Sequence, residues 1–151
     1  VYKRQLFLWV FGDNVEARLG SIRYIFFYLF CGIAADLMHA VFSGFSKVPV
    51  VGASGAISGV LGAYYVLFPG AMVKTLVPYG IFFGTVEIPA VAFIGIWFIY
   101  QLVYGLLSFA TKCGVAFWAH VGGFIAGYLI ARAIRPRGFR GPRVVRFIIR
   151  A

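Results

Sequence analysis

Acidic side chains are scarce in this sequence of 151 residues, which contains only Asp13, Glu16, Asp36 and Glu87. Charged residues of both signs make up 12% of the chain, whereas 62% is hydrophobic and the mean hydropathy is +0.94. A soluble domain of this size needs far more polar surface to stay dispersed. The shortage of charge therefore excludes a soluble globular domain and indicates a polytopic membrane protein.

Cysteine and histidine are equally rare, with two residues of each. Cys31 and Cys113 are too few for a disulfide framework, although a single disulfide between them stays open. Two histidines, His39 and His120, together with four acids supply too few ligands for a metalloprotease. The sequence predicts no metal and no cofactor.

Positive charge is abundant, with a formal net charge of +10, and it gathers at the C-terminus. Seven arginines lie in the last twenty residues, from Arg132 to Arg150, after the final apolar segment. A polybasic stretch beside a membrane helix typically sets its orientation and contacts anionic headgroups. We therefore expect the tail to contact the bilayer surface, and we do not expect nucleic-acid binding.

Apolar runs divide the chain into about four full spans and the end of a preceding helix, since a span needs roughly 20 apolar residues. The full spans are residues 22–42, 52–68, 90–109 and 115–134, and the partial one is 6–11. Residues 12–20 are expected to form a polar link, and residues 71–89 have mixed character. The predicted fold class is all-α, a single polytopic transmembrane helix bundle.

Basic residues fix the expected orientation of this bundle. Arg18, Arg23, Lys74 and the seven tail arginines fall on one side of the alternating spans, and only Lys47 and Lys112 fall on the other. By the positive-inside rule the first side is cytoplasmic. We expect a multi-pass protein of a bacterial plasma membrane with its C-terminus in the cytoplasm.

A hydroxyl and an imidazole occur at similar depth in two of the spans. Ser54 lies at the start of span 52–68, and His120 lies near the start of span 115–134. Both spans begin at the outer face, so both groups lie within roughly 10 Å of it at ~1.5 Å rise per residue. Polar groups in a bilayer are costly unless they pair, and a Ser–His pair is what nucleophilic hydrolysis needs.

Glycines share a helix face with each of these groups. Gly123 and Gly127 follow His120 at i+3 and i+7, and a second stripe accompanies Ser54 at Gly55, Gly59 and Gly62. Small residues let membrane helices approach closely. The two spans are therefore predicted to pack and to set Ser54 against His120. The alternative is that these glycines only pack helices and that Ser54 bonds a backbone carbonyl.

The predicted chemistry is that of a dyad in which His120 takes the proton of Ser54 and returns it to the leaving amine. Backbone amides at Gly52, Ser54 and Gly55 would stabilise the oxyanion at the start of the helix. His39 is a rival base, and a triad with Asp36 can be drawn. A structural or interfacial role is the favoured interpretation of His39, with Asp36 as its partner three residues away.

These residues resemble the rhomboid family of intramembrane serine proteases over residues 6–136. The resemblance rests on Gly52-Ala53-Ser54-Gly55, on Ala119-His120 with its two following glycines, and on the link 15–20, which is similar to the family's E-x-R element. It implies a six-helix core, Ser54 as nucleophile, His120 as general base and single-pass transmembrane substrates. It also implies a lateral gate on helix 88–107, at Trp97, Phe98 and Gln101.

The sequence also departs from the family pattern. The family carries an H-x-x-x-N pair that helps to bind the oxyanion, and here its asparagine position holds Arg4 while its histidine would precede Val1. Each lost donor costs ~10²–10³ in rate. We expect residues 1–5 to be a truncated or non-native leader and this chain alone to turn over weakly.

Some members of the family place a tyrosine one turn after the serine to stack on the base. Here that position is Ser58, so His120 would be oriented otherwise.

The alternative function is a catalytically inactive rhomboid-like protein that binds transmembrane clients. A transporter is disfavoured because no broken-helix repeat is visible. Residues 137–151 are expected to form a basic cytoplasmic tail.

Overall fold

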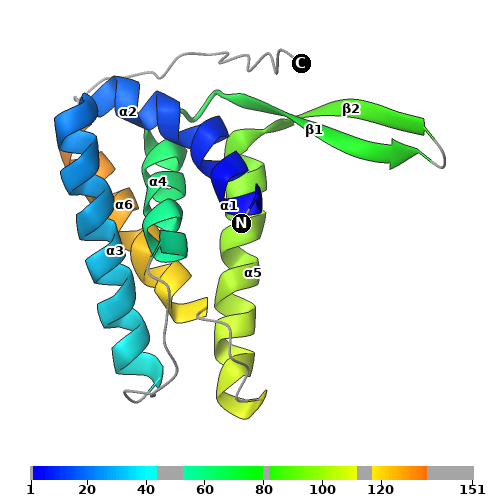
Figure 1. The fold of residues 1–151 in the computed structure, drawn as a ribbon. Coiled ribbons are helices and arrows are strands. Elements are labelled where there is room, and N and C mark those ends of the chain that lie inside the picture. The colour runs from blue at the N-terminus through cyan, green and yellow to red at the C-terminus, as the bar shows by residue number, and fades with distance from the viewer. Residues whose placement is uncertain (1, 44–52, 80–81, 112–116, 136–151) are drawn as a thin grey trace.

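A computed structural model describes residues 2–43, 53–79, 82–111 and 117–135 (Figure 1). The helices form one bundle, and two strands extend from one end of it. In chain order the elements are α1 (Tyr2–Phe7), the π-helical turn η1 (Leu8–Gly12), α2 (Asp13–Leu19), α3 (Ser21–Ser43), α4 (Ala53–Leu67), β1 (Met72–Tyr79), β2 (Phe82–Pro89), α5 (Ala90–Thr111) and α6 (Phe117–Ile134).

The helical membrane bundle expected from the sequence is confirmed. Within the described residues, three helices are long and apolar enough to cross a membrane, over Ser21–Phe42, Ala90–Leu107 and Phe117–Ile134. The predicted spans agree with α3, α4, α5 and α6 to within two residues at each end. Large apolar side chains stay exposed along α3 and α5, as lipid-facing surfaces require.

Helix α4 is short, at 15 residues, and it forms the centre of the bundle. Most of its side chains are buried, and Val60, Leu61 and Tyr64 are almost completely inaccessible. Its first turn begins well short of the ends of α3 and α5, on the side away from the strands (Figure 1). A residue in that turn is therefore recessed among longer helices.

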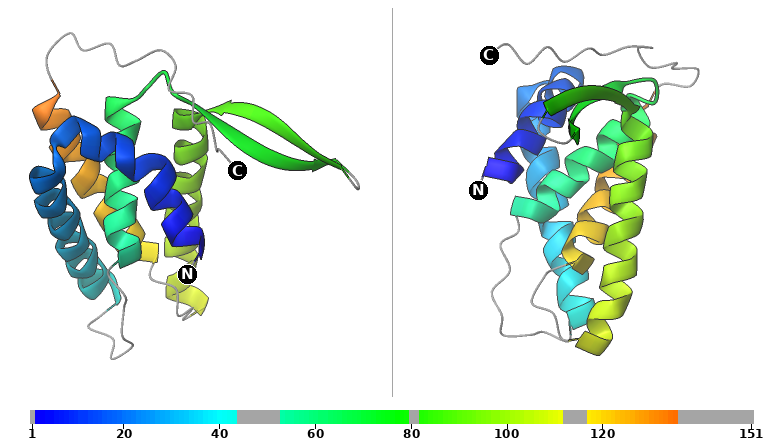
Figure 2. Two further views of the ribbon diagram at one scale, coloured as in Figure 1. Left: turned by 45° about the horizontal axis from the view of Figure 1, so that its top comes forward. Right: turned by 90° about the vertical axis from the view of Figure 1, so that its right-hand side faces the viewer.

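The N-terminal segment is helical throughout, which differs from the polar link expected over residues 12–20. Elements α1, η1 and α2 follow one another without a break and cross the face of α4 and α5 (Figures 1 and 2). The Phe11 ring packs edge-on against Tyr64, with 4.9 Å between centroids. The helix ends at Gly20, whose φ of 82° only glycine adopts readily.

Two antiparallel strands, which hydropathy did not predict, lie in the region of mixed character between α4 and α5. Strands β1 and β2 pair from Met72 opposite Pro89 to Tyr79 opposite Phe82. Lys74 and Glu87 face each other across the strands at 3.6 Å, half-exposed, so this ion pair adds at most about 1 kcal/mol. The two strands project away from the helices (Figure 2).

Candidate active site

Ser54 is the second residue of α4 and lies in its first turn. Amides in a first turn have no carbonyl four residues earlier within their own helix, so they can receive an anion. Ser54 and Gly55, two of the residues predicted to bind the oxyanion, occupy this turn. The third, Gly52, lies outside the described residues. The Tyr28 hydroxyl of α3 donates a hydrogen bond to the Ala53 carbonyl at 3.3 Å, which ties the start of α4 to α3.

His120 is the fourth residue of α6 and faces α5. Its Nδ1 lies 2.9 Å from Oε1 of Gln101. The Trp97 ring lies 6.0 Å from the imidazole, measured between centroids. The imidazole is thus held from α5 by one polar and one aromatic neighbour.

Ser54 and His120 open into the same cavity, which has a volume of about 200 Å³. Its walls come from α1, α4, α5 and α6, and the other lining residues are Phe7, Ile57, Ser58, Leu61 and Trp97. Because these are mainly apolar, the hydroxyl and the imidazole supply most of the cavity's reactive polar groups. The structure therefore brings together the two residues that sequence spacing paired across 66 positions.

The glycine faces of α4 and α6 lie directly against each other. A Cβ added at Gly123 would collide with the Gly55 carbonyl, and one added at Gly127 would collide with the Gly59 carbonyl. A Cβ at Gly55 would lie 3.3 Å from the Ala119 carbonyl, beside His120. This close backbone approach places Ser54 of α4 and His120 of α6 at the same height along the two packed helices.

Gly62 continues the same contact toward the other end of α4. A Cβ added there would collide with the Phe124 carbonyl of α6. All five glycines that the sequence placed on facing stripes, at positions 55, 59, 62, 123 and 127, therefore lie where α4 and α6 approach each other.

The rival residues on α3 lie elsewhere. His39 and Asp36 are not among the residues that line the cavity. Asp36 is exposed on the surface of α3, and no hydrogen bond or ion pair joins it to His39 within the described chain. The Nδ1 atom of His39 is buried without a hydrogen-bond partner there. The structure thus does not bring the alternative triad together.

The three predicted gate residues all lie on α5 but differ in their contacts. Trp97 lines the cavity. Phe98 stacks on Phe124 of α6, with 4.2 Å between ring centroids. Gln101 is buried, with 5% of its surface exposed, and it bonds the imidazole. This last contact was not predicted from the sequence, although an amide in the middle of an apolar helix needs a polar partner.

Ser58 makes a local contact only. Its Oγ donates a hydrogen bond to the Ser54 carbonyl at 2.8 Å. This back-bond to the fourth preceding residue satisfies the hydroxyl within α4. Ser58 is a second hydroxyl in the cavity and is therefore a rival to Ser54 as the nucleophile.

Comparison with known proteins agrees with this architecture. Residues 5–137 match the family model described as Rhomboid domain. The chain is 29% identical over 129 residues to the mitochondrial Rhomboid protein 1 of Saccharomyces cerevisiae, covering 82% of this chain and 34% of the yeast protein. It is 33% identical over 130 residues to the Rhomboid protease GluP of Bacillus subtilis, covering 85% of this chain and 22% of that protein.

The chain thus spans about a third or less of the length of the curated relatives it matches. No solved structure matches it significantly. The family match covers most of the chain, including both Ser54 and His120. With its apolar helices it is an integral membrane protein, and it belongs to the rhomboid family.

Proposed function

We propose that this chain is an intramembrane serine endopeptidase that cleaves transmembrane segments of single-pass membrane proteins. The observation that carries the proposal is the shared cavity of Ser54 and His120, recessed in a helical membrane bundle. Membership of the rhomboid family, to which the protease GluP belongs, supports the same activity.

The reaction proceeds through an acyl-enzyme. Nε2 of His120 takes the proton from Ser54 Oγ as the oxygen attacks the scissile carbonyl carbon. His120 then gives that proton to the leaving amine as the C–N bond breaks. Water then attacks the ester carbonyl carbon while His120 takes its proton, and His120 returns that proton to Ser54 Oγ as the ester bond breaks. This releases the acid and restores the Ser54 hydroxyl. Amides of the first turn of α4, at Ser54 and Gly55, stabilise the oxyanion.

Substrate reaches this cavity sideways, between α1 and α5. Phe7 and Trp97 line the cavity from these two helices. The Phe7 ring lies against Phe93 of α5, with 6.2 Å between centroids, so an apolar contact joins the two walls there. Trp97 and Phe98 form the movable wall of the gate.

The protein lies in a bacterial plasma membrane with the end of the bundle that carries the two strands toward the cytoplasm. The basic residues Arg18, Arg23 and Lys74 favour this orientation.

An active-site probe tests the proposal. A fluorophosphonate should label the chain in liposomes, slowly because Arg4 stands at the asparagine position of the family's oxyanion pair, and mass spectrometry should find the adduct on Ser54. Ser54→Ala should abolish labelling, because no other activated hydroxyl replaces Oγ. Ser21→Ala, a serine change at the exposed start of α3, should label like the wild type.

Two outcomes would contradict the proposal. An adduct on Ser58, the second hydroxyl of the cavity, would show that Ser54 is not the nucleophile. A chain that keeps its helical circular dichroism but takes no label would instead favour a catalytically inactive protein that holds transmembrane clients.

A further inference from the structure

Gln101 and Ser58 are the buried polar side chains recorded in the described part of the chain. Ser58 bonds its own helix, whereas the Gln101 amide reaches from α5 to α6 and meets the imidazole of His120. A buried amide in an apolar span is costly unless it makes such a bond. The contact therefore joins the helix of the predicted gate to the predicted base.

We propose that Gln101 is a positioning residue that fixes the tautomer of His120, an inference that rests on the proposed function. Its Oε1 can only accept a hydrogen bond, so the 2.9 Å contact requires a proton on Nδ1 of His120. A neutral imidazole carries one proton, which leaves the Nε2 lone pair to accept the proton of Ser54. The opposite tautomer would present an N–H to the serine and could not act as a base.

A glutamine suits this task in a bilayer. A carboxylate on Nδ1 would stabilise the imidazolium more strongly, but burying that charge among apolar helices costs much more than burying a neutral amide. The amide gives orientation without a permanent charge. The nearby Trp97 ring limits rotation of the imidazole on the same side. Together these two contacts orient the imidazole of His120. Ser58 is unsuited to that role, since its hydroxyl is bonded within α4.

Gln101→Met tests the proposal, because methionine keeps the length and apolar fit of the side chain but accepts no comparable hydrogen bond. We expect kcat to fall by about 10²-fold with KM unchanged, as for a misoriented general base. Gln101→Glu restores an acceptor and should recover most of the rate, with the acid limb of the pH–rate profile moved to higher pH. An unchanged kcat in a folded Gln101→Met variant would overturn the proposal.

Nitrogen-15 spectra of the two histidines add a readout that does not need activity. His39→Ala assigns the remaining signal to His120, which should show a protonated Nδ1 in the wild type and lose that preference in Gln101→Met. A protonated Nε2 in the wild type would also overturn the proposal. If the proposed function fails, Ser54 takes no label at all. If only the positioning role fails, wild type and Gln101→Met take label equally fast.

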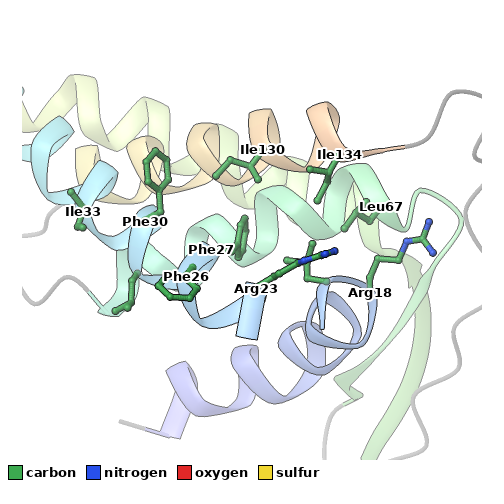
Figure 3. Close-up of a pocket in the computed structure, with 11 residues that line it drawn as sticks. Arg18, Arg23, Phe26, Phe27, Phe30, Ile33, Leu67, Ile130 and Ile134 are labelled. Carbon is green, nitrogen blue, oxygen red and sulfur yellow. The ribbon is translucent and has the colours of Figure 1, made fainter. Parts of the chain in front are cut away.

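An apolar groove of about 750 Å³ lies between α3 and α6 (Figure 3). Its length is lined by aromatic and aliphatic side chains, among them Phe26 and Phe30 of α3 and Ile130 and Ile134 of α6. It shares no lining residue with the cavity of Ser54 and His120.

Two cations lie at one end of this groove. Arg18 lies in the last turn of α2 and Arg23 in the first turn of α3. Figure 3 shows both side chains at the end of the groove that Ile134 and Leu67 also reach. Guanidinium groups bind phosphate oxygens through paired hydrogen bonds. An apolar channel with two guanidinium groups at its end matches the chemistry of a phospholipid, which carries its phosphate at the membrane surface and its acyl chain inside.

We infer that the groove holds an anionic glycerophospholipid, with its phosphate on Arg18 and Arg23 and an acyl chain along α3 and α6. The charge of the arginines selects for an anionic headgroup over a zwitterionic one. The bound lipid would then bridge α2, α3 and α6 on the flank away from the predicted gate.

Native mass spectrometry of the detergent-solubilised chain, titrated with phosphatidylglycerol or phosphatidylcholine, tests this site. We expect phosphatidylglycerol to bind at least about tenfold more tightly, and the double variant Arg18→Gln with Arg23→Gln to remove that preference. The matched control is Arg132→Gln, because Arg132 is an arginine of α6 two residues before Ile134 and does not line the groove.

Three results would overturn the lipid site. Equal binding of both lipids would remove the role of charge. An equal loss in Arg132→Gln would show a general basic surface. Full competition by inorganic phosphate would show that a free anion, without an acyl chain, is the ligand.

Discussion

Replacing His120 with alanine is expected to lower the already weak kcat/KM of this chain for a single-pass substrate in liposomes by about 10⁴-fold, because the serine loses its general base. Labelling of Ser54 by a fluorophosphonate should fall in parallel. His39→Ala, by contrast, should leave both rates within about threefold, since His39 does not line the cavity. The measurement is initial cleavage rate by quantitative gel, with protein folding checked by circular dichroism.

The double variant Ser54→Ala with His120→Ala sharpens this test. Residues that act as one unit are not additive, so the double variant should be no slower than Ser54→Ala alone. A His39→Ala chain that loses activity while His120→Ala keeps it would assign the base to α3. That result would contradict both the dyad and the positioning role of Gln101.

Alanine at Gly123 or Gly127 is expected to lower the free energy of unfolding by about 1–3 kcal/mol each. The added Cβ would meet the carbonyl of Gly55 or Gly59, and a backbone obstacle cannot rotate aside as a flexible side chain can. The helices must therefore separate. Reversible unfolding in mixed detergent and dodecyl sulfate, followed by circular dichroism, measures the loss.

Activity should respond to the same change, because α4 carries Ser54 and α6 carries His120. A displacement of about 1 Å between reacting groups can cost 10²-fold in rate. Gly95→Ala is the matched control, since its Cβ would find its nearest neighbour, Tyr65, at 4.0 Å. Equal stability of Gly127→Ala and Gly95→Ala would refute the tight contact between α4 and α6.

Local patterns in the sequence predicted the helices of the bundle well. Long apolar runs bounded by Pro, Gly and charged residues mark spans, and α3 to α6 follow those runs within two residues at each end. The two strands were missed because hydropathy cannot separate an apolar strand from an apolar helix. Their β-branched residues, such as Val73, Thr75, Val86 and Ile88, were the available indication of strands.

The candidate site was predictable only in part. Matching depth and glycine stripes paired Ser54 with His120, because those features depend on helix geometry and chain order alone. The partner of Gln101 could not be predicted, since an amide on α5 could have faced α1, α4 or lipid as well as α6. Only the rotation of α5 against its neighbours placed its Oε1 on the imidazole.

The sequence by itself determined the membrane bundle, its spans and the two residues proposed for catalysis, because burial in lipid depends on composition and period along one segment. The tertiary structure alone decided how deeply α4 is recessed, which atom orients His120, and where Arg18 and Arg23 meet an apolar groove. These features arise from contacts between segments far apart in the chain, and such contacts depend on how whole helices pack rather than on any local pattern.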